Sequence, residues 1–258
     1  MPKIVFKICP YKPSSAGAQN LKEALEELLP YSVERVTPDY RIKSNEWIIN
    51  WGNGNFRAER QDDVVNTKVI NSARKVCYCI NKLDFFRILE DEDVVIPRWT
   101  TRSDIARKWV SEGTPVYCRG DIEGRDGRGI QIATTSKEII PAHLYTAKIE
   151  SDQEFRVHVF KHKPIFDLIK RHHKPTKENN LVRSGSNGWN YHRDITLPDI
   201  AHQEAIKTSK ALGMDFCAVD ILWNSKTRIA TVLEANSAPE LGPWTRAAYA
   251  KEFINLTK

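Results

Sequence analysis

Two apolar runs near the end of the chain, 217–223 and 229–236, constrain the fold more than any other feature. Both runs are rich in residues that favour strands, and the short polar stretch between them is typical of the turn of a β-hairpin. If the hairpin is symmetric about Thr227, Asp220 and Glu234 face each other across the two strands. Directly opposed residues of an antiparallel pair hold their Cβ atoms about 4.5–5.5 Å apart.

Two carboxylates at this spacing repel each other unless positive charge lies between them. Mg²⁺ takes oxygen ligands and commonly combines one or two carboxylates with substrate phosphates. Asn236 lies two residues beyond Glu234, so on a strand it points to the same face and offers a third oxygen. The pattern therefore predicts either a metal site formed by Asp220, Glu234 and Asn236 or a solvated sheet face with two unrelated acids.

With 258 residues, the chain is long enough for one large domain or for two to three small lobes. No apolar run approaches the length needed to span a bilayer, so we expect no membrane partner. The five cysteines are odd in number and include no CxxC pair, which indicates buried free thiols and a cytoplasmic protein. Cys77 and Cys79 alternate along a run that is typical of a strand, which would place them on one face.

The net charge of +6 is concentrated in one part of the sequence. Residues 156–177 include many basic side chains and a single acid, Asp167. This concentration suits an anionic partner such as a nucleotide phosphate, a carboxylate substrate or a nucleic acid. A solvated basic surface is the alternative, and only the arrangement of these side chains in space separates the two.

The remaining pattern predicts an order of strands and helices. A strand over 3–9, a helix that begins near residue 14 and is closed by Pro30, and a strand over 46–51 form an α/β unit. Residues 56–75 are polar and predict a loop. Further helices are expected over 81–89, with Asn81 as the N-cap, over 103–112, over 198–212 and from Thr245. Further strands are expected over 115–119, 129–133, 144–149 and 154–160.

Two loops stand out between these elements. The turn over 120–129 is rich in glycine and joins two strands. Glycines allow backbone N–H groups to approach phosphate oxygens, although a plain β-turn has the same composition. The turn matches neither a Walker A loop nor a dinucleotide fingerprint, because no helix begins there. The polar segment 172–195 is long enough to predict a functional or disordered loop.

The order of these elements resembles the ATP-grasp superfamily of carboxylate–amine ligases. Within it, the likeness is to the glutamate ligases that modify ribosomal protein and to a set of phage-encoded ATP-grasp proteins. The most specific match is Asp220 followed by Val232-Leu233-Glu234-Ala235-Asn236-Ser237-Ala238-Pro239, which is similar to the metal-binding signature of the family. The resemblance spans nearly the whole chain and is least diagnostic over residues 1–75.

The resemblance implies roles for further residues. Arg119 and the glycines Gly124, Gly127 and Gly129 would bind the nucleotide phosphates, together with Lys82 before its helix. Thr146, Ala147 and Lys148 match the adenine-binding hinge, and Glu154 and Arg156 match the strand that follows it. Lys170 falls where the family has an Arg that faces the γ-phosphate and the acyl phosphate. Arg183 and Asn187 of the long loop would stabilise charge on the reaction intermediates.

Three positions depart from the family pattern. Arg119 replaces a Lys, which keeps the charge but presents a planar fork in place of a point charge. Ala147 stands where a Glu often accepts a hydrogen bond from adenine, so recognition would depend on backbone groups and the choice of ATP over GTP is open. Lys170 replaces an Arg.

The resemblance implies a mixed α/β and α+β fold with ATP-grasp architecture. An N-terminal α/β lobe (1–75) would be followed by two α+β lobes, 76–140 with the glycine loop and 141–258 with the metal site, that clasp the nucleotide. The expected activity is ADP-forming ligation of a carboxylate to an amine through an acyl phosphate, with ATP and Mg²⁺ or Mn²⁺. The amine would be an amino acid, a peptide or a protein tail, in the host cytoplasm if the chain is phage-encoded. There are two alternatives, a basic nucleic-acid-binding protein and an ATP-binding pseudoenzyme. The pI of about 9.0 favours the first of them.

Overall fold

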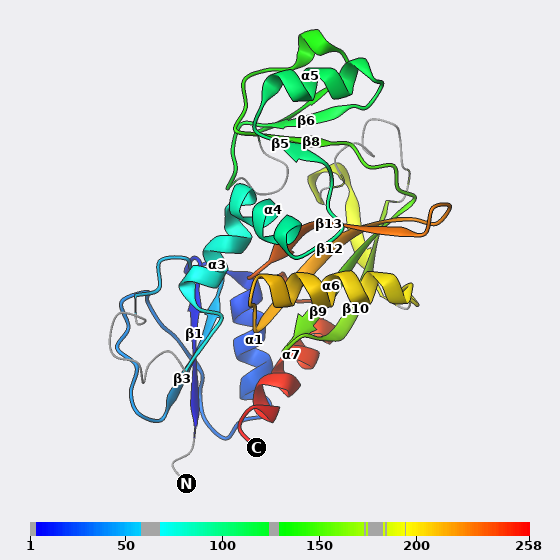
Figure 1. Ribbon diagram of the computed structural model, residues 1–258. Helices are drawn as coiled ribbons and strands as arrows, with labels where there is room; N and C mark the ends of the chain where they lie inside the picture. The colour runs from blue at the N-terminus through cyan, green and yellow to red at the C-terminus, as the bar shows by residue number, and fades with distance from the viewer. Residues whose placement is uncertain are drawn as a thin grey trace.

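The computed structural model describes residues 4–57, 68–123, 129–172, 174, 183, 185–193 and 195–258. Within these residues the strands form three sheets, drawn in Figure 1 from the N-terminal sheet at the lower left to the small sheet at the top. The N-terminal sheet is parallel and has the order β2-β1-β3-β4. Its strands are β1 (Val5–Pro10), β2 (Glu34–Arg35), β3 (Glu46–Trp51) and β4 (Val69–Ile70).

The first helix, α1 (Ala16–Glu26), begins where the Ser15 side chain accepts a hydrogen bond from the Ala18 N–H. Its apolar face, which includes Leu21 and Leu25, is fully buried. The helix ends at Glu26, so it stops one turn before Pro30, the residue that the sequence predicted would close it.

The segment after β4 differs from the sequence prediction. Residues 73–80 form helix α3 (Ala73–Ile80), although the alternation of Cys77 and Cys79 predicted a strand. The buried residues Ala73, Val76 and Cys79 recur every third position, which is the helical spacing, and Cys77 is exposed. The Ser72 side chain caps this helix, so the predicted loop over 56–75 is wrong at its end, where β4 and α3 lie. Asn81 then caps α4 (Lys82–Asp91), as predicted, by accepting hydrogen bonds from two backbone N–H groups.

The small sheet has the order β5-β8-β6-β7 and carries its own core. Its core residues come from the sheet and from α5 (Ser103–Ser111) and include Val110, Val116 and Tyr145. The strands are β5 (Trp99–Thr100), β6 (Val116–Arg119), β7 (Ile130–Ala133) and β8 (Leu144–Ala147). Because β8 pairs with both β5 and β6, this sheet extends to residue 147, past the boundary at 140 that we expected from sequence.

The large sheet is antiparallel and has the order β11-β10-β9-β12-β13. Helix α6 (Asp199–Ala211) covers one face, where Val157, Val159 and Val219 are buried against Ala205. On the opposite face, Glu154 and Arg156 of β9 line a cavity, whereas His158 and Phe160 are covered by the last helix of the chain. The strands are β9 (Gln153–Phe160), β10 (Lys163–His172), β11 (Trp189–His192), β12 (Phe216–Asn224) and β13 (Ile229–Asn236).

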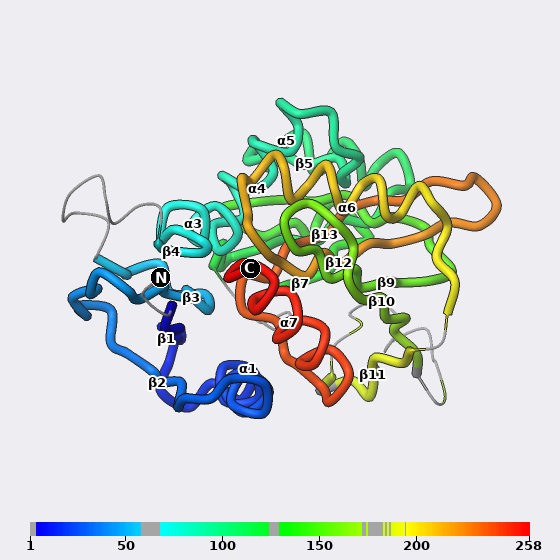
Figure 2. The backbone as a smooth tube through the Cα atoms, turned by 90° about the horizontal axis from the view of Figure 1, so that it is seen from below, coloured from blue at the N-terminus to red at the C-terminus, as the bar shows by residue number. Residues whose placement is uncertain are grey.

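The last helix, α7 (Pro243–Asn255), returns to the N-terminal part of the chain and lies beside α1 (Figures 1 and 2). It contributes Tyr249 and Phe253 to a core that also contains Trp51 of β3 and Phe216 of β12. The Trp51 and Phe216 rings are stacked with their centroids 5.1 Å apart. One aromatic core therefore joins the N-terminal sheet to the large sheet. None of the helices in the described ranges is both long and apolar enough to cross a membrane.

Candidate active site

A cavity of about 1240 Å³ lies between the small sheet, the large sheet and the start of α7. Its floor is the open face of the large sheet. One wall is formed by the small sheet and residues 146–151, and the other by residues 240–245 with Asn20 of α1. Charged side chains of both signs line it, among them Lys82, Arg119, Lys148, Glu154, Arg156, Lys170, Arg183, Asp220 and Glu234.

The hairpin β12–β13 brings the two predicted acids together. Asp220 is directly opposite Glu234, as we predicted, although the predicted symmetry about Thr227 is wrong. Asn224 pairs with Ile229, so the turn is one residue shorter than that symmetry requires. A β-bulge at Leu233 inserts the missing residue and restores the pairing at the acids. The bulge also lets the consecutive residues Leu233 and Glu234 both line the cavity, which strict alternation does not allow.

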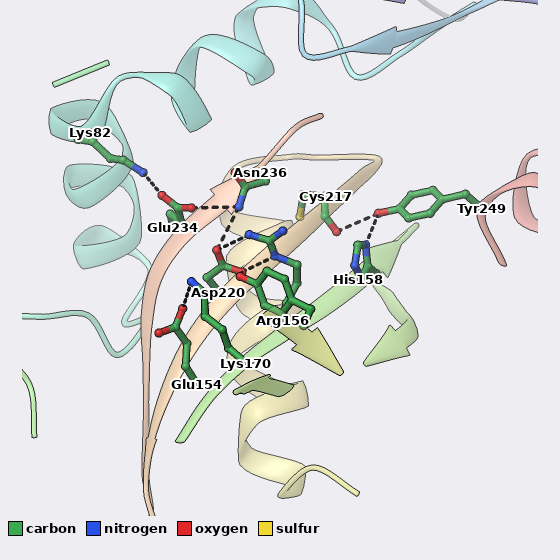
Figure 3. A network of polar contacts seen from close by, with 11 residues as sticks. Lys82, Glu154, Arg156, His158, Lys170, Cys217, Asp220, Glu234, Asn236 and Tyr249 are labelled. Atoms are coloured by element: carbon green, nitrogen blue, oxygen red, sulfur yellow. Dashed lines mark hydrogen bonds and ion pairs between the residues drawn. The ribbon is translucent and has the colours of Figure 1, made fainter. Parts of the chain in front are cut away.

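Positive groups already neutralise both acids (Figure 3). Arg156 donates two hydrogen bonds to Asp220, from Nε to Oδ1 at 2.6 Å and from NH2 to Oδ2 at 2.7 Å. Lys82 Nζ lies 2.9 Å from Glu234 Oε2. The positive charge of Lys82 holds the pKa of Glu234 well below its ordinary value, although burial opposes this shift. Burial disfavours the charged guanidinium of Arg156, but the Asp220 carboxylate outweighs it and raises the Arg156 pKa.

Asn236 completes the predicted group of three. Its amide Nδ2 donates to Asp220 Oδ2 at 3.3 Å and to Glu234 Oε1 at 3.2 Å, so all three side chains share one face of the hairpin (Figure 3). This donor set of two carboxylates and one amide fits a hard cation such as Mg²⁺, because each group can present an oxygen to the same point. In the part of the chain that the structure describes, no three His, Cys, Asp or Glu side chains gather as metal ligands, so the amide is needed as the third group.

A third ion pair lies beside these two on the cavity floor. Lys170 Nζ is 2.7 Å from Glu154 Oε1, and both side chains are nearly buried. Burial raises the pKa of Glu154, and the Lys170 charge opposes that shift. The Arg183 guanidinium lies 3.9 Å from the other Glu154 oxygen and donates to the Ser151 carbonyl at 3.2 Å.

Arg119 differs from the other cations of the cavity. It is the last residue of β6, and its buried Nε has no hydrogen-bond partner among the residues that the structure describes. Burial lowers the pKa of Arg119, and the nearby Glu234 charge partly offsets this effect. An inward-facing guanidinium nitrogen without a partner is costly in the absence of an anion, so this position favours a bound anionic group.

The predicted hinge lies at the edge of the cavity. Thr146, Ala147 and Lys148 all line it. The Ala147 N–H donates to the Arg98 carbonyl at 2.9 Å and the Lys148 N–H to the Pro115 carbonyl at 2.8 Å. These two donors are used within the fold, so neither is available to a ligand in the cavity. Ile149 and Glu150 also line the cavity, and sequence reasoning did not select them.

The predicted loop residues have different outcomes. Gly124 and Gly127 lie outside the described residues. Gly129 has φ of 71°, which favours glycine, and its carbonyl accepts from the Gly120 N–H at the base of the turn. Asn187 is exposed, and among the described residues it is not one that lines the cavity.

The described part of the basic segment does not form one surface. Arg156 and Lys170 line the cavity, His158 is buried beneath α7, and Lys161 pairs with Asp215. These basic side chains therefore have different surroundings, and a nucleic-acid interface is not supported.

Sequence reasoning missed one residue at the centre of the site. Tyr191 of β11 contacts Arg156, Lys170 and Asp220. Its signal in the sequence was a short alternating run, Trp189-Asn190-Tyr191-His192, inside a segment that we interpreted as loop. The wall beyond the floor, with Glu240 and Trp244, was also missed, because it follows the hairpin without any recognisable motif.

Comparisons with known proteins agree with this geometry. No family model matches the chain. A probable alpha-L-glutamate ligase of Psychromonas ingrahamii is 26% identical over 198 residues, which is 70% of this chain and 63% of the relative. The chain thus spans less than two thirds of the length of this curated relative. A solved structure of the ATP-grasp ligase PsnB, complexed with a minimal precursor, has a TM-score of 0.69 at 13% identity and covers 99% of both chains.

A second solved structure, the D-alanine–D-alanine ligase of Bacillus anthracis, has a TM-score of 0.66 at 15% identity, over 99% of this chain and 97% of that one. Both neighbours match the whole architecture, including the N-terminal sheet. The chain therefore has the ATP-grasp fold, and the resemblance to ATP-grasp ligases that its motifs indicated is confirmed.

Proposed function

We propose that the chain is an ADP-forming ligase that joins a carboxylate to an amine through an acyl phosphate. The observation that carries the proposal is the charge arrangement of the cavity floor. Three cations are paired with three acids, Lys82 with Glu234, Arg156 with Asp220 and Lys170 with Glu154, and Arg119 lies beside them without a hydrogen bond at Nε. Alternating charges of this kind suit phosphoryl transfer, where catalysis consists of positioning and charge neutralisation.

The volume of the cavity supports two ligands. Pockets for one drug-sized ligand measure about 300–1,000 Å³, and this cavity measures about 1240 Å³. The nucleotide base would bind at the wall formed by residues 146–151, and its phosphates would extend along β9 toward Arg156. The second ligand would then lie toward residues 240–245, near Trp244.

Each step of the reaction uses residues of this floor. A substrate carboxylate oxygen attacks the γ-phosphorus, and the bond to the β-phosphate oxygen breaks to release ADP. The amine nitrogen then attacks the acyl carbon, phosphate leaves with the bonding electrons, and the nitrogen loses its proton. Lys82 and Arg119 would neutralise the phosphates, and Lys170 and Arg183 would stabilise the acyl phosphate. Asp220, Glu234 and Asn236 would hold Mg²⁺ or Mn²⁺, which supplies charge neutralisation when bound.

The acceptor is proposed from the neighbours. The relative of Psychromonas ingrahamii is described as a glutamate ligase, and the PsnB structure contains a peptide precursor. We therefore propose an amino acid or a peptide as the amine or acid substrate.

An ADP-release screen of amino acids and short peptides with ATP and Mg²⁺ tests the proposal. We expect one acid–amine pair to raise ADP release above the level with ATP alone. Glu234→Gln should abolish this stimulated turnover with the fold intact, and Glu112→Gln, an exposed residue of the small lobe, serves as the matched control. Full activity of Glu234→Gln would contradict the assignment. Nucleotide binding without ADP release for any substrate would instead support the pseudoenzyme.

A further inference from the structure

Tyr191 contacts three charged groups of the site, and the proposed function gives it no role. It lies directly opposite Lys170 in the pairing of β10 with β11. The centroid of its ring is 4.2 Å from Arg156 Cζ and 5.2 Å from Lys170 Nζ. Its hydroxyl donates to Asp220 Oδ1 at 3.4 Å. One side chain therefore touches two cations and one acid on three neighbouring strands.

The ring suits a site that holds two like charges close together. The face of an aromatic ring is electrostatically negative, so it attracts a guanidinium and an ammonium without neutralising either. Each cation already has one carboxylate partner, and a further carboxylate in the place of the ring would reduce the charge available to a ligand. The ring also restricts the rotamers of Lys170, which otherwise has a flexible four-carbon stem.

The hydroxyl contributes less than the ring. Its distance of 3.4 Å to Asp220 is long for an O–H···O hydrogen bond, whose usual range is about 2.5–3.0 Å. Asp220 also already accepts two shorter hydrogen bonds from Arg156. Removal of the hydroxyl should therefore leave the acid and the guanidinium in place.

We infer that Tyr191 is a positioning residue whose ring holds Arg156 and Lys170 together so that both face the terminal phosphate of the nucleotide. The identity of the anion, a nucleotide phosphate, rests on the proposed function. The contacts of the ring with Arg156 and Lys170 do not depend on it. Functional groups must be held within about 0.5 Å by their neighbours to act together, and Tyr191 contacts both cations.

The test compares Tyr191→Phe, which keeps the ring, with Tyr191→Leu, which removes it. A proton held over an aromatic ring resonates upfield, so the Arg156 Nε–H signal in the ¹⁵N-labelled protein reports the stacking directly. We expect this upfield shift in the wild type and in Tyr191→Phe, and its loss in Tyr191→Leu. Equal Arg156 signals in all three proteins would overturn the inference. This measurement needs no substrate, so it stands even if the ligase proposal fails.

The second measurement separates positioning from general damage to the cavity. Calorimetry in the presence of Mg²⁺ gives the affinities for a non-hydrolysable ATP analogue and for ADP. We expect Tyr191→Leu to weaken binding of the ATP analogue about tenfold and binding of ADP less than about twofold, because only the former carries the terminal phosphate. Tyr191→Phe should resemble the wild type in both.

An equal loss of both affinities in Tyr191→Leu, or a loss in Tyr191→Phe as large as in Tyr191→Leu, would overturn the inference. If Tyr191→Leu does not fold, Tyr191→Met replaces it, since its unbranched side chain fills a similar space without a ring. Failure of the wild type to bind either nucleotide would contradict the proposed function and leave the NMR comparison to decide the role of Tyr191.

Discussion

Two acids, one just before β12 and one in its middle, have similar partners and different surroundings. Asp220 binds Arg156 through two short hydrogen bonds and faces the cavity. Asp215, just before β12, lies 2.6 Å from Lys161 Nζ and 3.4 Å from Lys75 Nζ. We call the surroundings of Asp220 the cavity network, comprising Lys82, Glu154, Arg156, Lys170, Tyr191, Asp220, Glu234 and Asn236. The surroundings of Asp215 form the lobe junction, comprising Asn71, Lys75, Lys161, Asp215 and Phe216.

The lobe junction is organised around a buried asparagine. Asn71 is fully buried, has a φ of 63° and makes four hydrogen bonds to residues 215 and 216. These bonds join the end of the N-terminal sheet to the start of the large sheet, next to the stacked rings of Trp51 and Phe216. Charged groups around an acid therefore have two uses in this molecule. The difference lies in whether a cavity or a packed core adjoins the acid.

The largest expected effect separates the two acids by activity. Asp220→Asn should lower stimulated ADP release by a factor on the order of 10²–10³, because it removes a charge from the floor of the reaction site. Asp215→Asn should change the rate less than about threefold, since it lies outside the cavity. Initial rates at saturating ATP measure both. If Asp215→Asn lost as much of the ADP-release rate as Asp220→Asn at a temperature where it remains folded, the lobe junction would not be separate from the reaction site.

The next effect concerns stability. Asn71→Ala leaves buried backbone groups without partners and replaces a residue that tolerates positive φ by one that does not, so we expect a loss of about 3 kcal/mol in the free energy of unfolding. For a chain of this size that corresponds to a decrease in Tm of roughly 6–12 °C. Thermal unfolding followed by circular dichroism measures it. Asn71→Gly removes the same hydrogen bonds without the backbone strain and should lose less, and the ADP-release rate of both variants at low temperature should match the wild type.

A third effect is the pH dependence of stability that arises from His158. Burial, aided by the Arg156 charge, lowers the pKa of His158 to about 3, whereas an unfolded His titrates near 6.5. Between these values the unfolded chain binds a proton that the folded chain does not, so stability decreases as the pH falls from about 6.5 to 3. The slope from this one group is at most about 1.4 kcal/mol per pH unit.

Urea unfolding at several pH values, compared with His158→Gln, isolates this contribution. The free energy of unfolding of the variant should depend less steeply on pH over the same interval. The difference in slope should correspond to at most one bound proton. Identical slopes in the two proteins would mean that His158 is not held neutral between Arg156 and Tyr249, to whose hydroxyl its Nδ1 is hydrogen-bonded at 3.2 Å.

The smallest effect lies at the edge of the lobe junction. The Lys161 side chain is 48% exposed, so its ion pair with Asp215 is screened by water. We expect Lys161→Gln to cost less than about 1 kcal/mol, well below Asn71→Ala. A cost as large as that of Asn71→Ala would show that charge, and not the buried amide, holds the junction together.

The local features of this molecule could be predicted from sequence. The opposition of Asp220 and Glu234 was predicted from a hairpin symmetric about Thr227 and is present, although the turn is one residue shorter than predicted. The N-cap at Asn81 followed from its residue type and position. The ATP-grasp fold could be predicted because the motif at 232–239 is specific, and the similarity to solved ATP-grasp structures confirms it. The bulge at Leu233 was not predicted, since it depends on how the hairpin pairs beyond its turn.

The features that depend on long-range contacts were missed. Asn71 acts on residues more than 140 positions away, so nothing in its own neighbourhood indicates its role. Tyr191 reaches the site from a segment that we interpreted as loop. The run around Cys77 and Cys79 was interpreted as a strand because the two cysteines alternate, and residues up to 75 were interpreted as loop. The cap at Ser72, which marks the start of helix α3, was not recognised.

The aromatic core shared by β3, β12 and α7 has a consequence for how the protein is made. The N-terminal sheet emerges first from the ribosome, but Phe216, Tyr249 and Phe253, which cover its apolar side, are synthesised some 165–200 residues after Trp51. At a synthesis rate of about 5–20 residues per second, the residues that cover this sheet are added roughly 10–40 s after Trp51. During that interval its exposed apolar surface is a target for chaperones and for aggregation, so slower translation should lower the yield of folded protein.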